Sequence, residues 1–149
     1  MDSVTQFSIF LVNKPGILAQ VTRHLAGARI NILAMTMMDS SEHGVLRLVV
    51  TDAAKLRAAV KGLNLPVTET DVLMVELPNK PGALADVCSR LAEDHINISY
   101  AYCTTGGPGG KARGVFKVAD AKKAGKVLKG PALKHRDMNH KLRRPVALR

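Results

Sequence analysis

Two short polar motifs carry the residues best suited to binding a small ligand. The sequence Asn-Lys-Pro-Gly occupies residues 13–16 and returns at residues 79–82, each time just before apolar residues at helical spacing. The first N–H groups of a helix lack intrahelical partners and attract anions, and glycine lets a ligand approach the backbone closely. A side-chain amide both donates and accepts hydrogen bonds. The spacing therefore predicts sites for a zwitterion, with its carboxylate at the helix start.

The candidate ligand-binding residues form two equivalent sets. Each set combines the motif's asparagine and glycine, the next two backbone N–H groups, and an asparagine expected to complete the polar rim where the following strand begins. An ordinary structural turn explains each motif as well, because Asn, Pro and Gly are common turn residues and a duplication would copy such a turn. The two sets are Asn13, Gly16, Ile17, Leu18 and Asn31, and Asn79, Gly82, Ala83, Leu84 and Asn97.

The two sets belong to an internal repeat. A shift of 66 residues, without a gap, aligns positions 13–32 with positions 79–98 and gives 12 identities in 20. This period matches a small domain and is longer than that of common solenoid repeats. Two tandem copies of one domain are therefore expected, at residues 1–70 and 71–130, with a basic tail at residues 131–149.

The elements that position the motifs have the same order in each copy: strand, helix, strand, strand, helix, strand. Runs rich in β-branched residues predict the strands, and apolar spacing of three and four predicts the helices. Pro15 and Pro81 are expected in the first turn of the first helix, and Asp52 and Asp120 at the N-cap of the second. The expected strands are residues 7–12, 30–38, 45–50 and 67–70, then 72–77, 96–104 and 115–118.

This order predicts an α+β fold of two ferredoxin-like βαββαβ domains, with antiparallel sheets and helices on one face. A copy of this size makes a small core, which favours pairing of the copies and further dimerisation. The second copy departs from the pattern, because no clear fourth strand follows residue 130. Residues 145–148 are the one short candidate.

The motifs resemble those of the ACT domain, an amino-acid-responsive regulatory module attached to many biosynthetic enzymes. The resemblance covers both copies and rests on residues 13–18 with 30–32 and on residues 79–84 with 96–98. It implies allosteric regulation by a free amino acid bound between neighbouring domains, beside the loop from strand one to helix one and the adjoining second strand. It also favours a homodimer that acts on a partner enzyme or regulator. Tyr100 and Tyr102 lie on the second copy's second strand, where one of them is expected to face the space between the domains.

The net charge of +10 is concentrated at the end of the sequence. Residues 1–110 carry 9 basic and 10 acidic residues, whereas residues 111–149 carry 13 and 2. Such a segment is more often a solvated terminus than a nucleic-acid site, so nucleic acid is an unfavoured partner. The alternative function is a nucleic-acid-associated regulator that uses this basic C-terminal segment.

Membrane, metal and catalytic functions find little support. No apolar run is long enough to span a membrane, and residues 1–3 do not begin a signal peptide, so a cytoplasmic protein is expected. Cys88 and Cys103 are expected to be buried, reduced thiols. The glycine-rich residues 104–112 lack the Walker spacing and predict a hairpin loop. No paired histidines or activated nucleophile appear, and we therefore expect no cofactor, no metal and no enzymatic activity.

Overall fold

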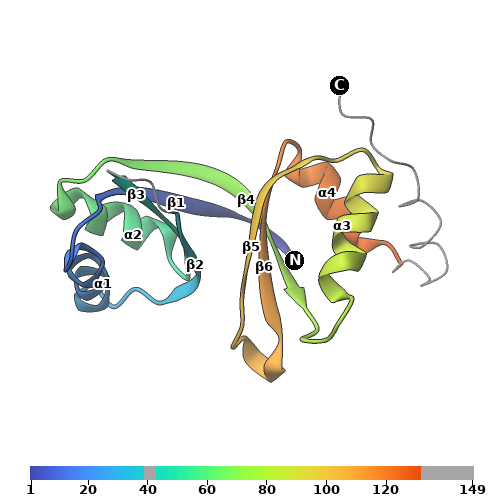
Figure 1. Ribbon diagram of the computed structural model, residues 1–149, viewed down its shortest axis with the longest axis horizontal. Helices are drawn as coiled ribbons and strands as arrows, with labels where there is room; N and C mark the ends of the chain where they lie inside the picture. The colour runs from blue at the N-terminus through green and yellow to red at the C-terminus, as the bar shows by residue number, and fades with distance from the viewer. Residues whose placement is uncertain (39–42, 132–149) are drawn as a thin grey trace.

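The computed structural model describes residues 1–38 and 43–131 (Figure 1). Each half contains three strands and two helices of its own in the expected order. Short 3₁₀ turns lie between α2 and β4, at Lys61–Leu63, and between β5 and β6, at Pro108–Gly110. The elements are β1 (Asp2–Val12), α1 (Ile17–Gly27), β2 (Ile32–Met38), β3 (His43–Val50), α2 (Ala53–Val60), β4 (Val67–Leu77), α3 (Ala83–Glu93), β5 (Ile98–Thr104), β6 (Ala112–Val118) and α4 (Ala121–Lys129).

All six strands form one antiparallel sheet in the order β2-β3-β1-β4-β6-β5. The two halves are ferredoxin-like and meet at the central pair β1 and β4, so the predicted fold class is confirmed. The predicted boundary at residue 70 falls inside β4. Residues 67–70 and 72–77, expected as two strands, are parts of one continuous strand.

The second half obtains its fourth strand from the beginning of β1. The pairing with β3 starts only at Phe7, whereas the pairing with β4 runs from Asp2↔Met74 to Ile9↔Val67. Residues 2–6 therefore occupy the place beside β4 where a fourth strand belongs. Local sequence could not show this, because the strand comes from the other copy. The candidate at residues 145–148 lies outside the described part of the chain.

A pseudo-two-fold axis relates the halves. The repeat shift of 66 carries Thr5 onto Asp71, and these two residues face each other in the β1–β4 register. Each central strand thus plays two roles: it is the first strand of its own half and the fourth strand of the other.

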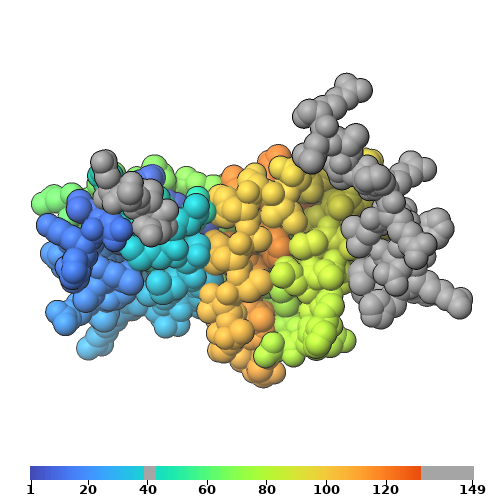
Figure 2. All heavy atoms as spheres, in the orientation of Figure 1, coloured from blue at the N-terminus to red at the C-terminus, as the bar shows by residue number. Residues whose placement is uncertain are grey.

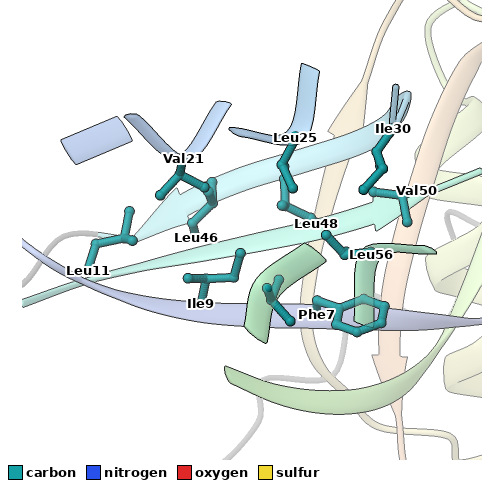
Figure 3. Packing of buried hydrophobic residues seen from close by; sticks show 11 residues of the cluster. Phe7, Ile9, Leu11, Val21, Leu25, Ile30, Leu46, Leu48, Val50 and Leu56 are labelled. Atoms are coloured by element: carbon teal, nitrogen blue, oxygen red, sulfur yellow. The ribbon is translucent and has the colours of Figure 1, made fainter. Parts of the chain in front are cut away.

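Alternate residues of the central strands build two separate cores. Phe7, Ile9 and Leu11 of β1 are fully buried beneath α1 and α2 (Figure 3). Leu73, Val75 and Leu77 of β4 are buried beneath α3 and α4. Each such side chain contributes about 1.5–3 kcal/mol to folding. Because residues directly opposite in a register share a face, all four helices cover the same face of the sheet.

The helix-free face of the sheet folds over on itself. Strands β2 and β5, at opposite ends of the strand order, contact each other and lie side by side in Figure 2. Between the two halves, buried apolar residues come from four different strands: Ala34, Val49, Val72 and Val115. The sheet is therefore strongly curled, with its helices on the outside.

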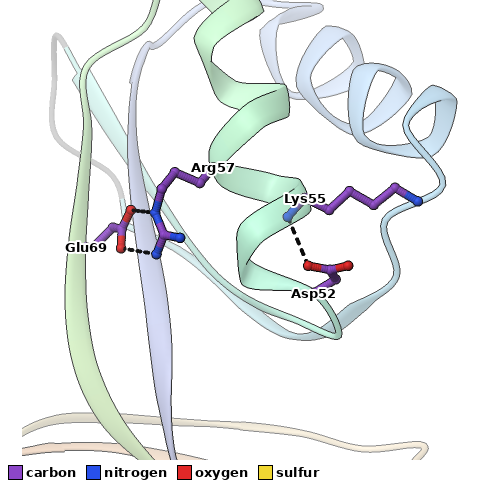
Figure 4. Close-up of polar contacts among 4 residues, drawn as sticks. All are labelled: Asp52, Lys55, Arg57 and Glu69. Atoms are coloured by element: carbon purple, nitrogen blue, oxygen red, sulfur yellow. Dashed lines mark hydrogen bonds and ion pairs between the residues drawn. The ribbon is translucent and has the colours of Figure 1, made fainter.

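The second helix of each half begins at the predicted N-cap. Asp52 Oδ1 accepts a hydrogen bond from the Lys55 backbone N–H at 2.9 Å (Figure 4), and Asp120 Oδ1 accepts one from the Lys123 N–H at 2.8 Å. Also in Figure 4, the Arg57 guanidinium donates two hydrogen bonds, of 2.6 and 2.7 Å, to the Glu69 carboxylate and so joins α2 to β4.

Two expectations about individual residues are corrected. Cys103 is exposed because it lies on the outermost strand β5, while Cys88 is partly buried; both thiols are free.

Residues 105–111 connect the β5–β6 hairpin as predicted, and the Gly107 N–H donates to the Lys111 carbonyl at 2.9 Å. In the described ranges, no helix is long and apolar enough to cross a membrane.

Candidate functional site

The first helix of each half begins at a left-handed glycine. Gly16 (φ 90°) is the N-cap of α1, and Gly82 (φ 88°) is the N-cap of α3. Pro15 and Pro81 therefore lie one residue before the N-cap, and not in the first helical turn as expected. The left-handed backbone is accessible to glycine at little cost, which explains why the turn requires this residue.

These two helix starts differ from the other two in having no side-chain cap. Asp52 and Asp120 occupy the N-terminal N–H groups of α2 and α4, whereas neither α1 nor α3 receives a side-chain cap hydrogen bond. A Cβ placed on Gly16 or Gly82 would meet no atom within 4 Å. The Ile17 N–H makes a long hydrogen bond of 3.5 Å to the Lys14 carbonyl, and the Ala83 N–H one of 3.4 Å to the Lys80 carbonyl. Neither helix start is covered by a side-chain cap.

The two helix starts are not electrostatically equal. The first turn of α1 contains no acidic residue, but that of α3 contains Asp86, which lies 3.6 Å from the Arg90 guanidinium. A carboxylate in the first turn opposes a bound anion. The start of α1 is therefore the better anion site.

The structure does not bring Asn31 to the glycine loop of its own half. In the strand registers Val12 faces His43 and Ile32 faces Val50, so the loop after β1 and Asn31 lie at opposite ends of β3. Seven residue steps of strand correspond to about 23 Å. Asn79 and Asn97 are separated in the same way by β6. All four asparagines are exposed.

The two glycine loops also lie far from each other. Each follows the C-terminal end of a central strand, and β1 and β4 run in opposite directions. Residue i of β1 faces residue 76 − i of β4, so Val12 and Leu77 are 13 steps apart, roughly 40 Å along the strands. Residues 13–18 and 79–84 therefore cannot contact one small ligand within a single chain.

A polar cluster that sequence reasoning foresaw only in part lies where the halves meet. The Gln6 side chain is fully buried; its Nε2 donates to the Tyr100 hydroxyl at 2.8 Å, and its Oε1 accepts from the Tyr102 hydroxyl at 2.9 Å. The Arg47 guanidinium stacks 3.8 Å from the centre of the Tyr100 ring. Both tyrosines, and not one as expected, face the space between the halves.

The comparisons with known proteins identify the family. A family model described as an ACT domain pair matches residues 2–140. The chain belongs to the ACT-domain family. This confirms the resemblance drawn from the two motifs, and the ACT pair described here is accordingly a regulatory module.

Solved structures resemble the ACT pair along most of its length. Protein BT0572 from Bacteroides thetaiotaomicron is 36% identical with a TM-score of 0.77, and the match covers 85% of this chain and 87% of that one. The ligand-free regulatory subunit of aspartate kinase from Thermus thermophilus is 17% identical with a TM-score of 0.63, covering 87% and 90%. The corresponding subunit from Thermus flavus is 20% identical with a TM-score of 0.57, covering 86% and 90%; the Thermus structures show the shared fold. A search of curated proteins finds no match.

Proposed function

We propose that this ACT pair is a non-catalytic sensor that binds a free α-amino acid at the start of α1, with the start of α3 as a weaker equivalent. The observation that carries the proposal is the contrast in capping. Aspartates occupy the N-termini of α2 and α4, while the two motif helices begin at bare, exposed glycines.

The ligand's carboxylate accepts hydrogen bonds from the backbone N–H groups of Gly16, Ile17 and Leu18, or in the second half from Gly82, Ala83 and Leu84. Its ammonium group contacts the carbonyl oxygen of the Asn13 or Asn79 side chain. Asp86 weakens the second site, because a carboxylate there repels the ligand's own.

The neighbouring domain that closes the site comes from a second copy of the chain. The two glycine loops of one chain lie at opposite ends of the central strand pair, so neither can close over the other. The proposal therefore includes a homodimer. In this dimer, the Asn31 or Asn97 that contributes to a binding site comes from the neighbouring copy of the chain.

Binding biases the arrangement of the domains, and a separate partner enzyme or regulator in the cytoplasm reads that arrangement. The partner class is proposed from the family and from the Thermus structures, which are regulatory subunits of aspartate kinase. The basic residues 132–149 lie outside the described residues, and the alternative nucleic-acid function would depend on them.

The proposal is tested by thermal unfolding of the purified protein against each of the twenty amino acids, followed by circular dichroism. A ligand that binds only the native state raises the midpoint; at a hundredfold excess over its Kd the stabilisation is about 2.7 kcal/mol. We expect one or a few chemically related amino acids to raise the midpoint.

Two matched variants locate the site. A side chain at Gly16 or Gly82 meets no steric obstacle, although the left-handed backbone costs roughly 1–2 kcal/mol, so Gly16→Val and Gly82→Val should remain folded. We expect Gly16→Val to abolish the ligand-induced shift and Gly82→Val to preserve most of it. Unchanged shifts in both variants would refute the assignment, as would the absence of any shift in the unaltered protein.

A further inference from the structure

The polar cluster between the halves, here called the junction cluster, consists of Gln6, Ser8, Arg47, Tyr100 and Tyr102. It lies on the helix-free face, and its side chains come from β1, β3 and β5. In the sheet β1 and β3 are neighbours, whereas β5 is separated from β1 by β4 and β6. Only the curl of the sheet therefore brings the tyrosines of β5 to the side chains of β1 and β3.

Arg47 has more donors than the described residues satisfy. Its Nη1 donates to the Met38 sulfur at 2.8 Å, which is a weak acceptor, and its Nε is buried without a hydrogen-bond partner. No described carboxylate forms an ion pair with this guanidinium. A buried N–H group left without an acceptor is rare and costly, and it calls for a specific explanation.

Tyr100 adds a further hydrogen-bond donor without an acceptor to those of Arg47. Gln6 pairs with both hydroxyls: its Nε2 donates to the Tyr100 oxygen, and its Oε1 accepts the proton of the Tyr102 hydroxyl. The Tyr100 hydroxyl proton has no acceptor among the described residues. Tyr100 and Arg47 are both partly exposed, so part of each side chain is open to solvent, while Arg47 Nε itself is buried.

The cluster is present on only one side of the pseudo-two-fold axis. The repeat and the strand registers place Val72 at the position equivalent to Gln6, and Val115 at that of Arg47. Ala34 is equivalent to Tyr100. If the fold itself required these polar residues, both halves would contain them. The polar residues of the junction cluster therefore have a role that is specific to this side of the pseudo-two-fold axis.

We propose that the junction cluster is a second ligand site, which binds a carboxylate between the Arg47 guanidinium and the Tyr100 hydroxyl. The planar guanidinium matches the two oxygens of a carboxylate, and no other described group supplies that acceptor. The site is separate from the helix starts: Arg47 faces Ser8 on β1, four residues before the strand ends at Val12. Its ligand contacts both halves at once.

The chain offers a built-in reporter for this site. It contains two tyrosines and no tryptophan, and both tyrosines belong to the junction cluster. Intrinsic tyrosine fluorescence therefore reports on this region alone. We would titrate the full chain with acetate, with succinate and with phosphate at constant ionic strength, using chloride as the matched salt.

We expect a saturable fluorescence change with the two carboxylates and none with chloride or phosphate. Arg47→Gln should weaken the carboxylate response at least tenfold, and Arg47→Lys, which keeps the charge but loses the planar fork, should weaken it less. Arg23→Gln removes a charge from the exposed surface of α1 and should leave the response unchanged. Circular dichroism checks that each variant is folded; if Arg47→Gln is not, Arg47→Lys decides.

Several results would overturn the proposal: no saturable response to carboxylates, an equal response to chloride, a preference for phosphate, or an undiminished response in the Arg47 variants. The Gly16→Val variant separates this site from the proposed sensor site. Loss of the acetate response in Gly16→Val would show that the tyrosines report the helix start and would refute the junction site. Amino-acid stabilisation without any acetate response would refute the junction site and leave the proposed function standing.

Discussion

Tyr102 is the residue whose ionisation the protein interior opposes most clearly. Burial raises the pKa of its hydroxyl far above the ordinary value, the neighbouring Tyr100 raises it further, and the positive charge of Arg47 offsets part of the shift. The hydroxyl therefore stays protonated and continues to donate to the Gln6 amide oxygen. A hydrogen bond that holds the two halves together thus persists throughout the physiological pH range.

This raised pKa predicts a loss of stability in alkali. The unfolded tyrosine ionises near its ordinary pKa of about 10, while the folded one does not. Its contribution is thus present below pH ~10 and is lost as the pH rises through the folded pKa. Urea unfolding from pH ~8 to ~11 should show the free energy of unfolding falling more steeply in the unaltered protein than in Tyr102→Phe. Equal slopes would contradict the prediction.

At the scale of elements, β1 supports two different halves with its two ends. Residues 2–6 pair with β4 alone among the described strands, so a disturbance there should affect the second half selectively. The first half retains β1 from Phe7 onward and should be affected less.

The substitution Val4→Pro tests this double role. Proline removes a backbone donor from the strand and should destabilise the second half by about 1–3 kcal/mol. Hydrogen exchange should become faster at residues 71–74 of β4 and remain slow at residues 44–48 of β3. Val4→Ala, which keeps the backbone N–H, serves as the control. Equal acceleration in both regions would argue against separate roles for the two ends of β1.

The sequence predicts well those elements that depend on interactions between residues close along the chain, and poorly those that depend on distant residues. The helices and their caps at Asp52 and Asp120 were predicted correctly, because apolar spacing and capping depend on residues close in sequence. The extension of β1 back to Asp2 was missed, because that pairing needs a partner about 70 residues away. The loop motifs predicted where the helices begin, but not the distance between Asn13 and Asn31. That distance depends on the length of the strand between them.

At the scale of the whole molecule, the proposed dimer and the proposed ligand should strengthen each other. If a second copy closes the site at Gly16, occupied protein dimerises more tightly than empty protein, by thermodynamic linkage. Sedimentation equilibrium should give a lower dimer dissociation constant when the stabilising amino acid is present. Gly16→Val should still dimerise but lose this dependence. A monomer that binds one ligand per chain would contradict the shared site.

The two halves are joined without a linker, because β4 continues from one into the other and β1 does the same in the opposite direction. Within residues 1–38 and 43–131, the two halves are therefore joined through paired strands and not through a loop about which one half could swing. A rotation of either half must instead be taken up as torsion of two hydrogen-bonded backbones, which resist it along their whole length. In mechanical terms the β1–β4 pair resembles a twisted beam, and the proposed ligand at one end would act on the other by changing the pitch of that beam.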